Sequence, residues 1–460
     1  MSVLDITRFH FVGVGGAGMS ALAELLLERG HEVSGCDRQA GPVTERLAGL
    51  GVDVRIGHAD HAPPDAALVV TSAVPADLPE LAAARSRGQT VLRRAELLGA
   101  VMDGMRGIAI AGTHGKSTTT AMIGAILEAA GRDPTVLVGG RIRGRQGNAR
   151  VGSGPWLVAE ADEFDRSFLT LSPECAVVNN VEADHLDTYG TMDALREAFR
   201  DFAARTRAGG IVVRGIDDLE TRAIPVPPGR RSVTFGLAAD ADVRAEALER
   251  ERLETRFRLV LPKGASAPVV LQVPGEHNVR NALGAAAAAW AVGVGTDDIR
   301  RGLAAVQGVE RRFEVVHEDA DVLIVDDYAH HPSEIAATLA SARSGWPGRR
   351  IVAVFQPHLY SRTRTLASEF GAALAQADLV FVTDVYAARE DPLPGVSGRL
   401  VSAAARAASA DAIDVENGAA EVVSARLRPG DLVVTMGAGD IDRVARELAR
   451  RRSGGRVDGC

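Results

Sequence analysis

One six-residue segment combines the residue types that bind a nucleoside triphosphate. It reads Gly112-Thr-His-Gly-Lys-Ser117 and lies between an apolar run, residues 108–111, and a helical pattern that begins at Lys116. In such a loop the backbone amides surround the phosphates, the ammonium reaches the β- and γ-phosphates, and the hydroxyl binds Mg²⁺. Ile110 stands where the common motif has its first glycine, so this is a shortened variant. Lys116 and Lys263 are the only lysines among 52 basic residues, which indicates a specific need for the Lys116 ammonium.

A second glycine-rich segment suits a diphosphate. Gly13-Val-Gly15-Gly-Ala-Gly18 follows an apolar run and opens a helical pattern, and Asp37 follows nineteen residues later. Glycines let the backbone approach a diphosphate at the start of a helix, where free amides point outward. The segment therefore predicts a site for a dinucleotide or a nucleotide sugar, and the alternative is a tight turn that binds nothing.

Two acidic segments follow apolar runs in the middle of the chain. Residues 160–165 read Glu-Ala-Asp-Glu-Phe-Asp, and residues 179–187 contain His185 among further acids and asparagines. Hard cations prefer oxygen ligands, so we expect Mg²⁺ near the first segment, opposite the phosphate loop. A solvated acidic loop and a capped turn are the alternatives for the two segments.

Two later segments are rich in histidine and arginine. Residues 326–332 read Asp-Asp-Tyr-Ala-His-His-Pro, and residues 356–364 read Gln-Pro-His-Leu-Tyr-Ser-Arg-Thr-Arg. They offer guanidinium groups for a carboxylate and imidazoles for proton transfer. We expect His330 and His331 to make polar contacts with a substrate rather than bind zinc, because no matching ligand spacing accompanies them.

Strands and helices must alternate for these loops to meet at the carboxyl ends of strands. Apolar runs separated by helical patterns recur throughout the 460 residues, which predicts parallel sheets covered by helices. Residues 253–261 and 268–273 alternate differently and predict antiparallel strands. We expect an α/β protein of three domains: residues 1–105 with a Rossmann-like fold, 106–308 with a P-loop ATPase-like fold and an added antiparallel region, and 309–460 with a second Rossmann-like fold.

The composition excludes several classes of protein. A hydrophobic fraction of 46% can form cores, and a net charge of −8 opposes binding to nucleic acid. Three cysteines cannot form a disulfide framework, and we see neither a signal peptide nor an apolar run long enough to cross a membrane. These features predict a cytoplasmic protein with no nucleic-acid or membrane partner. The sequence does not distinguish a monomer from a homodimer.

Together the segments resemble the Mur ligase family. The stretches that carry the resemblance occur in the family's order from residue 13 to residue 441: GVGGAGMSALAELL, GTHGKSTT, EADEFDRSFL, NVEADHLD, PGEHNVRNALGAAA, RRFE, DDYAHHPSEI, FQPHLYSRT, DVYAAREDPLPGV and GAGDI. The resemblance implies three domains that bind a UDP-sugar, ATP and an amino acid. It also implies that ATP and Mg²⁺ drive the joining of L-alanine to the lactyl carboxylate of UDP-N-acetylmuramate through an acyl phosphate, in peptidoglycan precursor synthesis.

The resemblance also implies roles for particular residues. The implied catalytic residues are Lys116, His185, His330 and Arg362, with His330 our choice for the base that deprotonates the amine. The implied Mg²⁺ ligands are Ser117, Glu160 and His185. The implied ATP contacts are Gly112, Thr113, His114, Gly115, Lys116, Ser117, Thr118, Asn278, Asn281, Arg312 and Asp327. The implied substrate contacts are Gly15, Gly16, Asp37, His58 and Ser72 for the UDP-sugar, and Tyr328, His358 and Arg362 for alanine and the intermediate.

Three other functions remain to be weighed. A ligase of the same family that attaches a preformed peptide to the same sugar is opposed by the segment FQPHLYSRT. An NAD-dependent oxidoreductase would use the first glycine loop but leaves the phosphate loop and both acidic segments unexplained. A nucleotide-switched binding protein is opposed by the histidine- and arginine-rich segments. Some members of the family carry a carbamylated lysine, but no lysine lies between Asp187 and Glu220.

Overall fold

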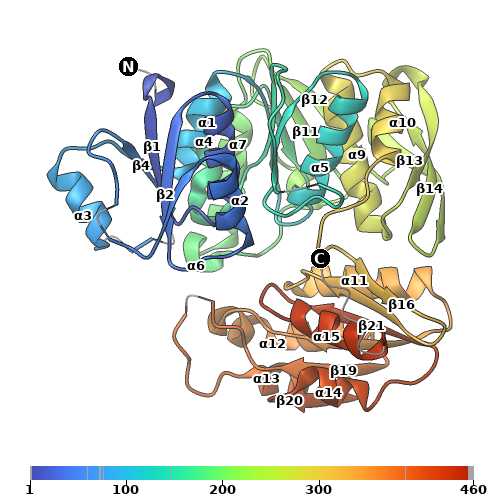
Figure 1. Cartoon of the computed structure of the whole chain (residues 1–460). Helices are drawn as coiled ribbons and strands as arrows, with labels where there is room; N and C mark the ends of the chain where they lie inside the picture. Colours follow the sequence, from blue (N-terminus) through green and yellow to red (C-terminus); the bar gives the residue numbers. More distant parts are fainter. Residues whose placement is uncertain are drawn as a thin grey trace. The chain divides into compact units, whose positions relative to one another are not determined.

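The computed structural model describes residues 3–59, 61–71, 74–75, 77–145, 147–388 and 390–453. Its strands form three sheets of five, ten and six strands, and the chain divides into two compact units (Figure 1). Unit 1 comprises the chain up to Leu248, Arg256–Val270 and Asn278–Gly308; unit 2 comprises Glu249–Thr255, Leu271–His277 and the chain from Val309 onward. Each unit is described by itself. No helix among the described residues is both long and apolar enough to cross a membrane.

The five-stranded sheet is entirely parallel, in the order β3-β2-β1-β4-β5. This is the order of a Rossmann-type sheet, which binds ligands beyond the carboxyl ends of the two strands where the order reverses, here β1 and β4. The glycine-rich loop after β1 lies at this position. The strands are β1 (Arg8–Val12), β2 (Glu32–Asp37), β3 (Asp53–Ile56), β4 (Ala67–Val70) and β5 (Val91–Arg93), and the helices are α1 (Ala17–Glu28), α2 (Pro42–Leu50), α3 (Pro79–Ser86) and α4 (Arg94–Asp103).

The ten-stranded sheet has the order β15-β14-β13-β12-β11-β10-β6-β9-β7-β8. Its central strands are parallel and buried, so their sequences are nearly continuous apolar runs. The strands are β6 (Arg106–Ala111), β7 (Thr135–Leu137), β8 (Ala149–Arg150), β9 (Trp156–Glu160), β10 (Cys175–Val178), β11 (Ile211–Gly215), β12 (Arg231–Gly236), β13 (Val243–Glu251), β14 (Glu254–Val260) and β15 (Ser266–Leu271).

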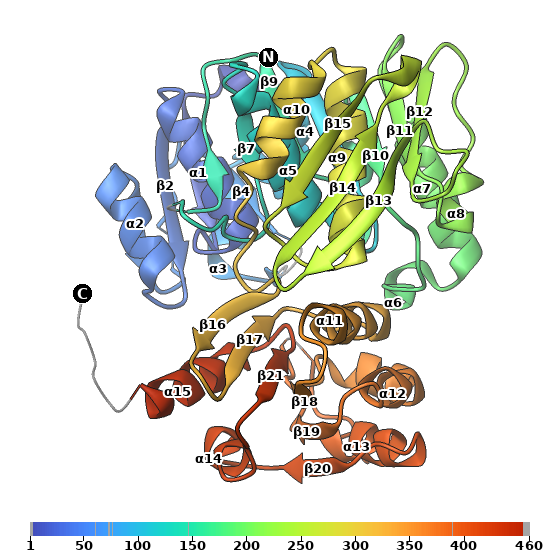
Figure 2. The same cartoon turned by 90° about the vertical axis from the view of Figure 1, so that its right-hand side faces the viewer.

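Helices flank this sheet, as a second view shows (Figure 2). Helix α7 illustrates their origin: the Thr191 side chain accepts a hydrogen bond from Ala194 N at its start, and Leu195, Phe199 and Phe202 are buried along one side. The α-helices are α5 (Lys116–Ala129), α6 (Leu186–Tyr189), α7 (Met192–Ala204), α8 (Leu219–Arg222), α9 (Glu276–Ala291) and α10 (Thr296–Ala304), and the short 3₁₀ helices are η2 (Phe164–Thr170) and η3 (Pro262–Gly264).

The predicted antiparallel region corresponds to β13, β14 and β15. Strand β13 pairs in parallel with β12, and only Arg252 and Leu253 separate it from its neighbour β14. A connection this short can join adjacent strands only as a hairpin, so β13 and β14 run in opposite directions. Alternation of buried and exposed residues along β14 explains the pattern seen in the sequence.

The six-stranded sheet of unit 2 has the order β16-β17-β21-β18-β19-β20 and is parallel except at its edge pair β16–β17. Separate apolar clusters pack on its two faces. The strands are β16 (Glu314–Glu318), β17 (Leu323–Asp327), β18 (Arg350–Phe355), β19 (Leu379–Thr383), β20 (Ala412–Val415) and β21 (Asp431–Met436), and the helices are α11 (Pro332–Gly345), α12 (Tyr360–Leu374), α13 (Gly398–Ala407), α14 (Ala419–Ser424) and α15 (Asp442–Arg452).

The three sheets confirm the α/β class that the sequence predicts. The boundaries at residues 105 and 308 stay predictions, because the first two sheets share one compact unit and two short segments from the antiparallel region belong to unit 2.

Candidate active site

The phosphate loop joins β6 to α5. Gly112 has a φ of +143° and Gly115 has a φ of +81°, so the loop uses conformations that favour glycine at both ends. The amides of Thr113 and His114 donate to the backbone and side-chain oxygens of Asn180, at 3.1 and 2.8 Å. The first amides of α5 have no acceptor within their own helix, which makes them the amides best placed to receive a phosphate.

Lys116 is held inside the loop by an acidic partner. Its Nζ donates to Gly112 O at 2.6 Å and to the two carboxylate oxygens of Glu163 at 2.9 and 2.8 Å. The Lys116 side chain is 15% exposed and that of Glu163 is 2% exposed. Burial alone would lower the pKa of Lys116, but Glu163 and neighbouring carboxylates outweigh it and raise that pKa. Lys116 is therefore a largely buried ammonium whose charged form is favoured by the carboxylates around it.

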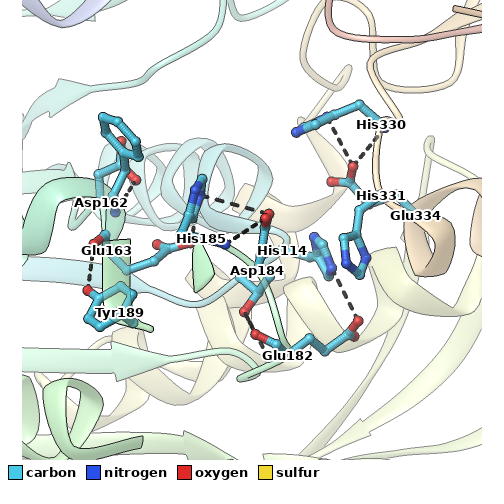
Figure 3. Close-up of polar contacts among 12 residues, drawn as sticks. His114, Asp162, Glu163, Glu182, Asp184, His185, Tyr189, His330, His331 and Glu334 are labelled. Carbon is cyan, nitrogen blue, oxygen red and sulfur yellow. Dashed lines mark hydrogen bonds and ion pairs between the residues drawn. The ribbon is translucent and has the colours of Figure 1, made fainter. Parts of the chain in front are cut away.

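Glu163 has an unusual electrostatic environment. Burial raises its pKa to about 7, and Asp162 adds to this effect while Lys116 opposes it. The hydroxyl of Tyr189 donates to the backbone oxygen of Glu163 at 2.6 Å (Figure 3). This clamp fixes the position of Glu163 and, through it, the position of Lys116.

Ser117 and Glu160 lie together next to this pair. The Ser117 side chain forms a hydrogen bond with the Glu160 carboxylate, and Gly139 N donates to the same carboxylate. Burial raises the pKa of Glu160, although these two hydrogen bonds lower it. A hydroxyl and a carboxylate in contact offer the oxygen donors that Mg²⁺ prefers, so the residues fit such an ion.

His185, the residue before α6 in the loop that follows β10, lies close to the same cluster. Its Nε2 lies 3.9 Å from Glu163 Oε1 and 3.8 Å from Asp184 Oδ2, and its ring packs edge-on against Phe164 (Figure 3). His185 has a φ of +54°, a left-handed backbone conformation that is uncommon outside glycine. The structure thus brings His185 to Lys116 through their shared partner Glu163.

Asn281 lies against the phosphate loop itself. Its Nδ2 donates to Asn278 Oδ1 at 3.2 Å, and its Oδ1 accepts from the Thr119 hydroxyl at 3.4 Å. A Cβ atom on Gly115 would approach that Oδ1 to 2.2 Å. Asn281 therefore supports the shape of the loop, and the adenine contact expected for Asn278 and Asn281 stays a prediction. Thr118, another predicted ATP contact, is a buried side chain on α5.

The glycine loop after β1 is closed by the predicted acid. Gly15 N donates to Asp37 Oδ2 at 2.9 Å, so the loop is joined to the end of β2. The UDP-sugar contacts expected for Gly15, Gly16 and Asp37 stay predictions. Gly16 begins α1 as its N-cap residue. His58 does not reach this loop by any described contact, because its Nδ1 faces Cys36 and Glu80 instead. Ser72 lies outside the described residues.

In unit 2, two guanidinium groups lie close to the ring of Tyr328. Arg311 and Arg312 sit 5.1 and 5.2 Å from the centre of its ring. Arg312 Nη1 also lies 3.3 Å from Glu334 Oε1, and Glu334 Oε2 accepts from His330 N at 3.0 Å (Figure 3). Glu334 therefore ties together two of the residues predicted from the sequence.

His330 is a neutral imidazole that is 20% exposed. Its Nδ1 lies 2.9 Å from Tyr328 O, and a carbonyl can only accept, so the proton is on Nδ1 and the lone pair is on Nε2. Burial lowers the pKa of His330 to about 4; Glu334 opposes this shift and Arg362 adds to it. The ring lies 5.9 Å from that of His358, which stacks on Tyr386. His330, His358 and Arg362 thus belong to one cluster.

Asp327 supports this cluster from the end of β17. Its two oxygens accept hydrogen bonds from Phe313 N and Ala329 N, at 2.7 and 2.8 Å. Burial raises its pKa to about 6, although Arg312 opposes the shift. Its direct contacts are therefore to the backbone around Tyr328, and the expected nucleotide contact stays a prediction.

Four residues of these clusters were not singled out from the sequence: Glu163, Asn180, Glu334 and Tyr386. Glu163 was one of four equivalent acids in a segment, and Asn180 was one of two adjacent asparagines. Glu334 lies in the first turn of α11, where acidic residues are common. Its position in the sequence therefore did not indicate a role in the site.

The fold and the site define a class: a nucleotide-dependent ligase built from a phosphate-loop domain between two Rossmann-type domains. Family models match along the chain, for the Mur ligase family catalytic domain at residues 8–106, the Mur ligase middle domain at 156–289 and the Mur ligase glutamate ligase domain at 311–439. The chain belongs to the Mur ligase family and has its three-domain fold.

Individual relatives of known name are similar over most of the chain. The UDP-N-acetylmuramate–L-alanine ligase of Stenotrophomonas maltophilia is 45% identical, over 96% of this chain and 95% of the relative. The crystal structure of the UDP-N-acetylmuramate–alanine ligase of Thermotoga maritima has a TM-score of 0.82 at 29% identity, covering 98% of this chain and all of that one. A UDP-N-acetylmuramate:L-alanyl-γ-D-glutamyl-meso-diaminopimelate ligase from Neisseria meningitides has a TM-score of 0.60 at 27% identity, covering 66% of this chain and all of that one.

Proposed function

We propose that this chain uses ATP to join L-alanine to the lactyl carboxylate of UDP-N-acetylmuramate, in peptidoglycan precursor synthesis. The carboxylate attacks the γ-phosphorus and releases ADP, which gives an acyl phosphate. The amine of alanine then attacks the acyl carbon, and the tetrahedral intermediate expels phosphate to leave the amide. The observation that carries the proposal is the largely buried group of Lys116, Ser117, Glu160 and Glu163 at the carboxyl ends of β6 and β9. The relative from Stenotrophomonas supports the choice of substrates.

The first step brings an anion to a polyanion. A carboxylate that approaches a triphosphate meets strong repulsion, which fixed positive charge must offset. Lys116 supplies such a charge in a water-poor place, because its ammonium is nearly buried and stays protonated. Glu163 holds Lys116 against the loop, so ATP phosphates compete with Glu163 for the ammonium.

We propose Mg²⁺ as the metal, held by Ser117 and Glu160 with His185 nearby. When bound, it supplies positive charge that neutralises the phosphate oxygens and orients the γ-phosphate. Two neighbours support the proposed ligands: Gly139 N donates to the Glu160 carboxylate, and Asp184 Oδ2 lies 3.8 Å from His185 Nε2.

The cluster in unit 2 suits an α-amino acid. Such a substrate carries a carboxylate and an amine on one carbon atom, so it needs a cation and a proton acceptor side by side. Arg362 lies close enough to His330 to lower its pKa, and the neutral His330 presents a lone pair on Nε2. We propose that Arg362 binds the alanine carboxylate and that His330 accepts the proton which the nitrogen loses on bonding to the acyl carbon.

The test is release of inorganic phosphate from ATP by the purified full chain. Release should require both UDP-N-acetylmuramate and L-alanine, and mass spectrometry should show the alanyl product. Phosphate release with neither acceptor would contradict the ligase. Product formation with a preformed peptide but not with alanine would favour the peptide-attaching relative. Oxidation of NADH would instead support a dehydrogenase.

The variant Lys116→Ala tests the role of the phosphate loop in this assay. We expect it to lower kcat by at least about 100-fold, because a single preorganised charge at a reacting group contributes on this scale. Binding of UDP-N-acetylmuramate, measured by calorimetry, should be unchanged, since the glycine loop after β1 is separate from the phosphate loop. Equal loss of sugar binding would contradict the separate assignment of the two loops.

Because ATP and UDP-sugars are made in the cytoplasm, we place the reaction there.

A further inference from the structure

A second cluster of ligand-type side chains lies in the five-stranded sheet, away from the phosphate loop. His10 comes from β1, Cys36 from β2 and Glu80 from α3, and all three are 0% exposed. Each offers one ligand atom, and these atoms lie within 4.8 Å of one another. His58, from the loop after β3, adds a fourth side chain. The ligase chemistry uses none of the three buried residues.

The spacing of three of these atoms matches a tetrahedral metal site. Cys36 Sγ lies 3.2 Å from Glu80 Oε2 and 3.4 Å from His58 Nδ1, and the latter two atoms are 3.4 Å apart. Ligands at zinc-like distances of about 2.0–2.3 Å in a tetrahedron are separated by roughly 3.3–3.8 Å. The three atoms therefore form a triangle close to one face of such a site.

His10 lies on β1, next to β2, and its ligand atom is within 4.8 Å of those of Cys36 and Glu80. The Ser34 hydroxyl donates to Phe9 O at 3.4 Å, so its oxygen is left to accept from His10 Nδ1, which lies 2.9 Å away. The proton of the neutral ring is then on Nδ1, and the lone pair is on Nε2. A hydrogen bond of this kind to the distal nitrogen is the usual way in which proteins fix a metal-binding histidine.

Charge and burial favour a divalent ion. A thiolate, a carboxylate and two neutral imidazoles carry two negative charges, which one divalent cation balances. A carboxylate that is fully buried is costly unless its charge is compensated. Apolar side chains surround Cys36, among them Leu68, Val70 and Leu81, so water competes poorly for the site. Sulfur and imidazole ligands favour zinc over magnesium.

We propose that His10, Cys36, His58 and Glu80 bind one Zn²⁺ ion as a closed structural site. Binding replaces the thiol proton of Cys36, which leaves to solvent as the Zn–S bond forms. In the absence of metal, burial raises the pKa of Cys36 to about 12 and Glu80 adds to this effect. The ion would join β1, β2, α3 and the loop after β3. Asp37, which follows Cys36, holds Gly15, so the site also stiffens the glycine loop.

Cobalt is a suitable probe, because Co²⁺ bound to a thiolate gives a charge-transfer band in the near ultraviolet. The purified, tag-free full chain is stripped with a chelator and titrated with Co²⁺, and Zn²⁺ is then added. We expect the band to saturate at one equivalent and Zn²⁺ to abolish it. Cys36→Ser should remove the band. Cys175→Ser and Cys460→Ser, which change the other two cysteines, should retain it.

Each outcome decides the proposal without reference to ligase activity. Absence of the band in the wild-type chain, or a band that survives Cys36→Ser, would overturn it. If Cys36→Ser does not fold, Glu80→Gln serves instead, since it keeps the shape of the side chain and removes one charge. This variant should bind Co²⁺ at least tenfold more weakly, and an unchanged affinity would also overturn the proposal. Metal analysis of the unstripped chain should find close to one zinc per molecule.

Discussion

His330 and Asp327 should make opposite contributions to the pH dependence of stability in unit 2. The pKa of His330 is lowered from an ordinary value of 6.5 to about 4, so the unfolded chain binds its proton first as pH falls. Stability from this residue is complete above pH 6.5 and declines as pH falls toward 4. Between pH 7 and pH 5 the loss is roughly 2 kcal/mol.

Asp327 has the reverse sign. Its pKa is raised from 3.8 to about 6, so the folded chain binds its proton first. Stability from this residue is complete below pH 3.8 and is lost as pH rises through 6. Between pH 7 and pH 5 the folded state therefore gains about 1 kcal/mol from Asp327. In the wild-type chain the two contributions largely cancel.

Single variants should reveal each contribution. In His330→Asn, whose amide can still donate to Tyr328 O, the Asp327 effect remains and stability should rise by about 1 kcal/mol between pH 7 and pH 5. In Asp327→Asn the His330 effect remains, and stability should fall by roughly 2 kcal/mol over the same interval.

The measurement is urea unfolding followed by the fluorescence of Trp346, which stacks on Phe313 in the core of unit 2. Replacing Trp156 and Trp290 by Phe leaves it as the sole tryptophan. The change with pH is compared, not the absolute stability, because each substitution also alters hydrogen bonds. Parallel pH curves for both variants and the wild-type chain would refute the reasoning.

Three further predictions concern the ligase reaction. Gly115→Ala should raise the KM for ATP at least tenfold in a phosphate-release assay, because the left-handed backbone costs about 1–2 kcal/mol and the added Cβ meets Asn281; an unchanged KM would show that the loop adapts. Glu160→Gln should raise the Mg²⁺ concentration needed for half-maximal rate by about tenfold or more, whereas Asp165→Asn, which alters an exposed carboxylate of the same segment, should not. Arg362→Ala should raise the KM for alanine far more than that for ATP, and the reverse pattern would place this residue elsewhere.

Local patterns predicted the framework of the site well. The glycines and apolar run around residue 112 require a strand, a turn and a helix, and the structure has β6, the loop and α5 at those places. Likewise, the glycine-rich segment with Asp37 nineteen residues later predicted a strand, a turn and a helix, and Asp37 accepts a hydrogen bond from Gly15 in that turn. These predictions were possible because they concern only elements that follow one another in the chain or pair in the same sheet.

The choice among chemically similar residues could not be predicted. Glu163 turns inward to Lys116 just before Asp165 and Arg166, which adopt φ values of +53° and +61°. The identities of these two residues are not enough to predict a left-handed backbone conformation. The place of His58 beside Glu80 depends on where α3 packs, and its expected contact with a sugar nucleotide stays a prediction. Contacts of this kind arise from tertiary packing between distant segments. The spacing of residues within a short stretch of one sequence does not predict them.

The packing of Asn281 against Gly115 has a consequence for how the protein is made. Synthesis proceeds from the N-terminus, so the loop at residues 112–117 leaves the ribosome well before α9, whose Asn281 also binds Thr119. The loop of a growing chain thus lacks its contact with Asn281 until more than half of the polypeptide has emerged. A chain that stops before α9 therefore carries the phosphate loop without the contact that Asn281 makes with it.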